Sequence, residues 1–176
     1  QTEVTTAGNK ETSGNGSIMR LAPVAIFYHD NLELAIKNAA LQSLTTHQGL
    51  EAADCCRILA YFIVKAINSP KPDSKNLKGY AKKFFNSLDI ENELLKELET
   101  EAGKCIAMSK AEKKFDKNNF NQVPEDRNWN WKDEKFKYSP TRAKLNPGYI
   151  GSYACDGLAM ALHCVYHTTS FKECIL

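Results

Sequence analysis

The run LEAADCCRILAYFIVKAI, residues 50–67, decides the fold class. Its apolar side chains, among them Ile58, Phe62 and Val64, fall on nearly every side of a helix with 3.6 residues per turn. A helix that is apolar almost all round must be covered by other elements, so it belongs in the centre of a bundle. The following Ser69-Pro70-Lys71-Pro72-Asp73 ends the helix, because two prolines within three residues cannot continue it.

Amphipathic segments on both sides of this helix supply the covering elements. We expect a short helix starting at Ile18, and further helices at 32–43, 77–88, 91–108 and 153–167. Asp30 and Glu33 resemble a capping pair for the second of them, and Gly157 permits close packing in the last. The predicted fold is all-α, a compact multi-helix bundle in a single domain.

Residues 124–147 are predicted to form a long ordered loop. They carry Trp129, Trp131, Phe136 and Tyr138 among charged residues, with a proline at either end. Flexible linkers seldom contain four aromatic residues, so we expect these side chains to pack.

Composition and charge narrow the range of partners. The 176 residues are 43% hydrophobic and 25% charged, with a net charge of +2. The basic stretch 104–117 is interrupted by Glu112 and Asp116, which favours a solvated face over a nucleic-acid site. No window approaches the roughly 20 apolar residues that span a bilayer. We therefore expect neither a nucleic-acid nor a membrane partner.

The cysteines indicate a reducing compartment. Cys55, Cys56, Cys155 and Cys164 lie in apolar, helical runs, which is typical of buried thiols. No pair has the spacing of a zinc site, and a disulfide between two adjacent cysteines is strained. We expect a cytoplasmic protein.

The two ends of the sequence read as internal to a longer chain. Ser170 and Glu173 form a capping box, yet the helix they open has no room to develop before Leu176. Gln1 is not an initiator methionine. Residues 1–176 are therefore expected to be the central portion of a larger domain, truncated at both ends.

Three segments are candidates for chemistry. Gly14-Asn15-Gly16-Ser17 offers exposed backbone N–H groups that suit phosphate, although most such turns only reverse the chain. His47 lies between two predicted helices, where its imidazole either contacts a ligand oxygen or satisfies a helix-end carbonyl. Tyr149 to Tyr153 suits a nucleotide, or is a glycine turn anchored by aromatic rings. We interpret Asp156, in the first turn of the next helix, as structural.

Hydrolytic motifs are absent from the sequence. It contains no adjacent pair of aspartates, no Asp-x-Asp and no Gly-x-Ser-x-Gly. We identify no catalytic residue and no metal ligand in this chain.

The combination of motifs is more specific than its parts. Gly14-Asn15-Gly16-Ser17-Ile18-Met19-Arg20 with Pro23, then Thr46-His47, then Gly151-Ser152-Tyr153 before a helix resembles the ADP-ribosylglycohydrolase family. The segment from Pro124 through Trp131 to Ile150 looks like one branch of that family, so the resemblance spans nearly the whole chain.

The resemblance implies an all-α protein that releases ADP-ribose from a protein side chain or another acceptor, with the help of two magnesium ions. The Asp-Asp and Asp-x-Asp motifs that hold those ions in the family are missing here. The expected partner is ADP-ribose or an ADP-ribosylated protein, and we expect the fragment to hydrolyse nothing alone. The implied substrate-binding residues are Asn15, Gly16, Ser17, Met19, His47, Tyr149, Ile150, Gly151 and Ser152. The alternative is a non-catalytic ADP-ribose-binding protein or a crystallin-like structural protein.

Overall fold

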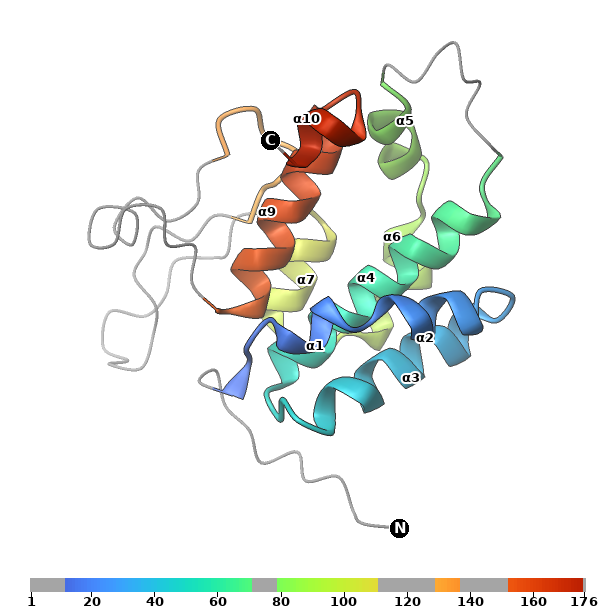
Figure 1. Ribbon diagram of the computed structural model, residues 1–176, viewed down its shortest axis with the longest axis vertical. Coiled ribbons are helices and arrows are strands. Elements are labelled where there is room, and N and C mark those ends of the chain that lie inside the picture. The colour runs from blue at the N-terminus through green and yellow to red at the C-terminus, as the bar shows by residue number, and fades with distance from the viewer. Residues whose placement is uncertain (1–11, 71–78, 111–128, 137–151, 176) are drawn as a thin grey trace, which may run out of the picture.

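The computed structural model describes residues 12–70, 79–110, 129–136 and 152–175, and helices dominate these ranges (Figure 1). The helices are α1 (Gly16–Met19), α2 (Ala22–Phe27), α3 (Leu32–Leu44), α4 (Leu50–Asn68), α5 (Tyr80–Asn86), α6 (Ile90–Glu93), the 3-10 helix η2 (Leu95–Glu97), α7 (Glu101–Ala107), α9 (Ala154–His167) and α10 (Phe171–Ile175). Over the described ranges no strand is formed, and an isolated antiparallel bridge joins Gly14 to Tyr153. The prediction of an all-α fold is confirmed.

Helix α4 lies between two layers of helices, as its sequence predicts (Figure 1). On one side α2 and α3 pack against it through a small cluster rich in alanine, which lets the helix backbones approach closely. That cluster contains Leu21, Ala25, Ala35, Ala39, Cys56, Ala60 and Val64. On the other side α7 and α9 contact α4 around a larger core that includes Ile58, Tyr61 and Phe62.

The start of α3 differs in detail from the prediction. Asn31, rather than Asp30, is the N-cap, and its side-chain oxygen accepts a hydrogen bond of 3.0 Å from the backbone N–H of Leu34. The expected helix from Ile18 is divided into α1 and α2, with Pro23 in the first turn of α2. Proline is tolerated there because the first helical N–H groups have no partner within the helix.

The expected single helix at 91–108 is wrong. The chain there forms α6, η2 and α7, and Leu98 is extended, with a ψ of 131°. Asp54 of α4 supplies the reason. Its carboxylate accepts hydrogen bonds from the backbone N–H groups of Glu99 (3.1 Å) and Thr100 (2.7 Å), which a continuous helix would have turned toward its own carbonyl groups.

The buried carboxylate of Asp54 also fixes how α7 packs. Asp54 is fully buried, accepts from the Thr100 hydroxyl at 2.6 Å and pairs with Arg57 at 2.7 Å. Gly103 of α7 lies directly against it, and a Cβ atom built at Gly103 would be 2.6 Å from Oδ2 of Asp54. A charge in the core is tolerated only when it is paired and hydrogen-bonded, and here both conditions are met.

The aromatic residues predicted to pack do so where the structure describes them. Trp129, Trp131 and Phe136 are buried, while residues 124–128 and 137–147 of the predicted loop, Tyr138 among them, lie outside the described residues. The indole N–H of Trp131 donates to the carbonyl of Ile106 at 2.7 Å. The indole N–H of Trp129 donates to Asp156 at 3.0 Å, so the interpretation of Asp156 as structural fits a side chain that anchors residues 129–136 to α9.

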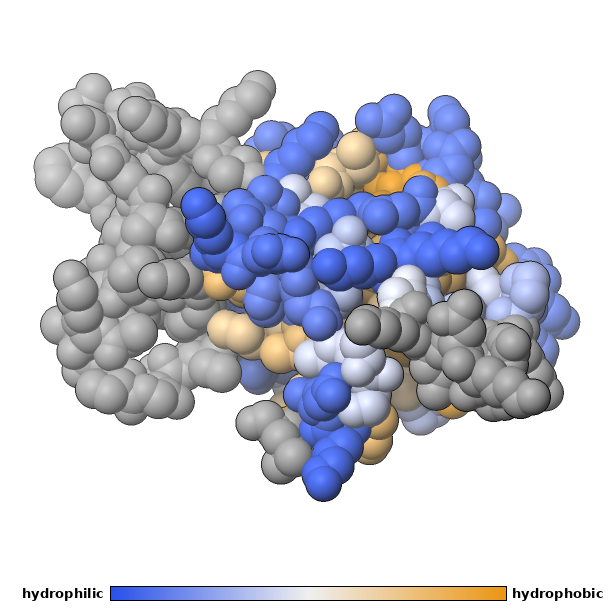
Figure 2. Space-filling model, turned by 90° about the horizontal axis from the view of Figure 1, so that it is seen from above, coloured by the Kyte–Doolittle hydropathy of each residue, from blue (hydrophilic) through white to orange (hydrophobic). Residues whose placement is uncertain are grey.

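Of the four thiols predicted to be buried, Cys55, Cys56 and Cys155 are buried, and the prediction is wrong for Cys164. Cys55, Cys56, Cys105 and Cys155 are buried and unoxidised, whereas Cys164 and Cys174 are partly exposed. Of the helices described, none combines the length and the apolar character needed to cross a membrane. Hydrophilic side chains cover much of the face seen in Figure 2, with smaller apolar areas between them.

Two helical glycines allow a matched test of this packing. Gly103→Ala forces the Asp54 carboxylate to move, and we expect the free energy of unfolding to fall by about 1–3 kcal/mol. At Gly157 a new Cβ meets Asn15 at 3.8 Å, an ordinary contact, so close packing does not require glycine there. Gly157→Ala should be neutral or stabilise by up to about 1 kcal/mol, through helix propensity. Urea unfolding of both variants measures the difference, and equal losses would contradict this account of α7.

Candidate functional site

The glycine turn is held against the start of α9 by two backbone hydrogen bonds. The N–H of Asn15 donates to the carbonyl of Ser152 at 2.6 Å, and the N–H of Ala154 donates to the carbonyl of Ser13 at 2.9 Å. These bonds produce the antiparallel bridge between Gly14 and Tyr153. Segments from opposite ends of the chain are thereby brought together.

The same segment is also fixed to the start of α4. The Ser13 hydroxyl, which is buried, donates to the Glu51 carboxylate at 2.7 Å, and the N–H of Gly49 donates to the carbonyl of Thr12 at 3.4 Å. The turn therefore lies between the N-terminal ends of α4 and α9 (Figure 1). Its position is set by two helices that are themselves packed in the core.

His47 lies in the connection between α3 and α4, as predicted, and its imidazole rests on the glycine turn. A Cβ atom built at Gly16 would be 2.9 Å from both Cε1 and Nε2 of the ring, and one at Gly14 would be 3.3 Å from Cδ2. The two glycines therefore have a steric role, because a side chain at position 16 would displace the imidazole. The helix-end carbonyl of Ser43 is satisfied by the backbone N–H of His47 at 2.8 Å, not by the ring.

The structure thus brings Asn15, Gly16, His47 and Ser152 to one place. Their role in binding a substrate stays a prediction. Tyr149, Ile150 and Gly151 lie outside the described residues. Met19, at the end of α1, is 77% exposed, so its side chain is accessible.

Ser17 differs from the other predicted site residues because its side chain faces the core. It is fully buried, and its hydroxyl accepts a contact of 3.5 Å from the Cys56 thiol. Burial raises the pKa of that thiol, so it remains a protonated donor at neutral pH. The exposed fraction of Ser17 is 0% for the whole residue, backbone included, so in this structure Ser17 presents no group to a ligand. Gly16, by contrast, is partly exposed, and its backbone N–H donates to no other residue in the described part of the chain.

Two motif residues that the sequence analysis did not assign to the substrate-binding site, Arg20 and Thr46, complete the surroundings of His47. Arg20 contacts the C-terminal end of α3 and also donates to the Thr46 hydroxyl at 2.6 Å. The Thr46 hydroxyl in turn lies 2.8 Å from Nδ1 of His47. Thr46 directly precedes His47, which was a usable signal, but nothing local indicated that Arg20 would reach a residue so far along the chain.

The described residues do not fit a two-magnesium site. No three His, Cys, Asp or Glu side chains within these ranges are grouped to hold a metal ion. Near the turn, the Glu51 carboxylate accepts from Ser13. Farther along α4, the Asp54 carboxylate is fully used by Arg57 and the start of α7. We assign no metal ligand and derive no chemical step through a metal.

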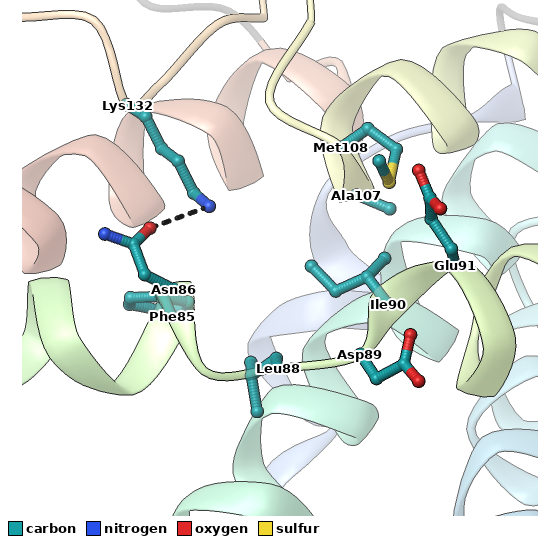
Figure 3. A pocket seen from close by; sticks show the side chains of 9 residues that line it. All are labelled: Phe85, Asn86, Leu88, Asp89, Ile90, Glu91, Ala107, Met108 and Lys132. Carbon is teal, nitrogen blue, oxygen red and sulfur yellow. Dashed lines mark hydrogen bonds between the residues drawn. The ribbon is translucent and has the colours of Figure 1, made fainter.

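A separate pocket of about 340 Å³ lies between α5, α6 and the end of α7 (Figure 3). Leu88, Ile90 and Met108 contribute apolar surface, and Lys132 donates to Asn86 at 3.1 Å on one side. Burial lowers the pKa of Lys132. None of the predicted site residues that the structure describes lines this pocket.

Comparison with known proteins places the chain in a family. The profile of the ADP-ribosylglycohydrolase family matches residues 2–176. The chain belongs to the ADP-ribosylglycohydrolase family. The glycine turn, His47 and the start of α9 all fall within the matched region, so the resemblance expected from the motifs is confirmed.

A relative in this family adds a shorter match. Over 57 residues the chain is 46% identical to the ADP-ribosylarginine hydrolase Tri1 of Pseudomonas putida (strain GB-1). That match covers 32% of this chain and 15% of the relative, so it spans a small part of the bacterial protein. No solved structure matches the chain.

The contact between His47 and the turn can be measured by a double-mutant cycle. Gly16→Ala should destabilise the chain because its new methyl group meets the imidazole, whereas the same change in a His47→Ala background should cost little. We expect a coupling of about 1–3 kcal/mol between the two positions. Thermal or urea unfolding of the four proteins measures it. Additive effects would show that the imidazole does not rest on Gly16 in solution.

Proposed function

We propose that this chain holds the ADP-ribose unit of a substrate and belongs to a protein that hydrolyses the bond between ADP-ribose and a protein acceptor. The observation that carries the proposal is the convergence of the Gly14–Gly16 turn, His47 and Ser152, the family's motif residues, at one place. Family membership supplies the reaction class. The match to an ADP-ribosylarginine hydrolase supports an arginine-linked substrate.

The groups at this place suit the oxygens of a nucleotide diphosphate. The backbone N–H of the partly exposed Gly16 is a donor, and the imidazole of His47 adds a side-chain donor or acceptor beside it. Hydrogen bonds to charged oxygens are stronger than those to neutral ones, so phosphate is the favoured partner. Exposed Met19 offers apolar contact close by.

In the hydrolysis that we propose for the intact protein, these residues bind and orient the substrate. Water attacks the anomeric carbon of the ribose, the bond to the acceptor breaks, and a proton passes to the leaving group. Holding the diphosphate fixes the ribose relative to the attacking water, which lowers the entropic part of the barrier. The described residues provide the grip, and we assign none of them to the chemical step.

His47 allows a direct test of binding. We expect His47→Ala to weaken the affinity for ADP-ribose about ten- to one-hundredfold, the loss that follows when a hydrogen bond to a charged group is removed. His29→Ala is the matched control, because His29 is exposed and its ring contacts only the carbonyl of Ile26 in the described residues. Isothermal titration calorimetry of the three proteins measures both effects. Equal affinities for all three would exclude His47 from the site.

Removal of metal gives a second test. Binding by this chain uses backbone donors and an imidazole, so its affinity for ADP-ribose should change less than about twofold, within 0.4 kcal/mol, between buffers with Mg²⁺ and with EDTA. The chain alone should also release no ADP-ribose from an ADP-ribosyl-arginine peptide. A tenfold loss of affinity in EDTA, or release of ADP-ribose, would show that metal ligands or catalytic groups are present in the chain.

Binding and hydrolysis assays on both the chain and the intact protein distinguish the three functions weighed from the sequence. Binding by the chain together with hydrolysis by the intact protein supports the enzyme. Binding by both without hydrolysis supports an ADP-ribose-binding protein, and absence of binding by both supports a structural, crystallin-like role.

A further inference from the structure

The guanidinium of Arg20 donates hydrogen bonds to the last turn of α3 and to the residues that follow it. It donates to the side-chain and backbone oxygens of Gln42, at 2.9 and 2.7 Å, and to the hydroxyls of Thr45 and Thr46, at 3.1 and 2.6 Å. An arginine side chain has donors and no acceptor. Arg20 is therefore the donor in every one of these bonds, two of which go to the last turn of α3 and two to the connection that follows it.

The direction of the first bond constrains the next one. The oxygen of the Thr46 hydroxyl accepts from Arg20, which leaves the hydroxyl proton available for donation to another acceptor. Nδ1 of His47, at 2.8 Å, is the acceptor that the described residues provide. A cation donating to a hydroxyl oxygen also polarises the O–H group and makes it a better donor.

We infer that Arg20 and Thr46 are positioning residues that hold His47 as the neutral tautomer with its proton on Nε2. Thr46 donates to Nδ1, and the Nε2–H edge then lies beside Gly14 and Gly16, where it is a donor for a phosphate or ribose oxygen. The role toward a ligand rests on the proposed function. The tautomer itself is a property of the free chain.

This geometry also explains why the donor is well placed. Arg20 is anchored to the C-terminal end of α3, and the ring is confined between the Thr46 hydroxyl and the two glycines of the turn. A side chain held on two sides loses less freedom when a ligand arrives, which favours binding. The inference thus adds Arg20 and Thr46 to the site as residues that act through His47.

The tautomer can be measured by two-bond ¹H–¹⁵N correlation spectra of the full chain labelled in its histidine rings, under conditions in which the ¹⁵N shifts show a neutral ring. Wild type should show the Nε2–H pattern at His47. Thr46→Val should lower the ratio of the Nε2–H to the Nδ1–H form about fivefold, the effect of one neutral hydrogen bond. Thr46→Ser, which keeps the hydroxyl, should restore the wild-type ratio.

Thr45→Val is the matched control. Thr45 also accepts from Arg20 and is exposed like Thr46. In the described residues its hydroxyl donates to the carbonyl of Gln42 and not to the His47 ring. Its substitution should leave the spectrum of His47 unchanged. An Nδ1–H pattern in wild type, an unchanged ratio in Thr46→Val, or an equal change in Thr45→Val would each overturn the inference.

Titration with ADP-ribose separates this inference from the proposed function. If the tautomer responds as expected but ADP-ribose does not bind, the proposed function fails and the positioning role stands. If ADP-ribose binds but the tautomer ratio of His47 is the same in Thr46→Val as in wild type, the positioning role fails and the proposed function stands. When both hold, Thr46→Val should bind ADP-ribose several-fold more weakly than Thr46→Ser.

Discussion

The pairing of Ser13–Asn15 with Ser152–Ala154 is the constraint on which the site depends. Its two hydrogen bonds, of 2.6 and 2.9 Å, link the beginning of the described chain to the start of α9. Without them the glycine turn would have no fixed position relative to α9, and the imidazole of His47 would have no surface to rest on. A single bridge suffices because each partner is anchored again: Ser13 bonds Glu51 of α4, and Tyr153 is buried in the main core.

Helix α4 connects this site to the rest of the molecule. Its first turn receives the Ser13 hydroxyl, its middle is enclosed by the two clusters of the core, and Asp54 organises the start of α7. The burial of Asp54 is costly, since removing a carboxylate from water is compensated only by well-made hydrogen bonds and pairing. The backbone N–H groups of Glu99 and Thr100 provide those bonds, and the chain is not helical at these residues. Site and core therefore share one scaffold.

The sequence indicated the fold class and the central place of residues 50–68, because a helix that is apolar on all sides has few other locations. Through the family resemblance it also placed the glycine turn and His47 in one substrate-binding site. It did not reveal the break at Leu98, because the acceptor responsible, Asp54, is distant in the sequence. The hydrogen bonds of Arg20 to Gln42, Thr45 and Thr46 could not be predicted for the same reason, because these partners are distant in the sequence. Likewise, Ser17 looked accessible beside two glycines, and only the packing of α1 on α4 shows that its hydroxyl points inward.

The central claim is that the turn, His47 and the start of α9 form one binding unit for ADP-ribose. Mapping of amide chemical shifts during titration with ADP-ribose tests it most directly. The account predicts that the amides of Gly14, Gly16, His47 and Ser152 shift together with one common dissociation constant. Shifts confined to the separate pocket around Leu88, Met108 and Lys132, with these four amides unchanged, would contradict it.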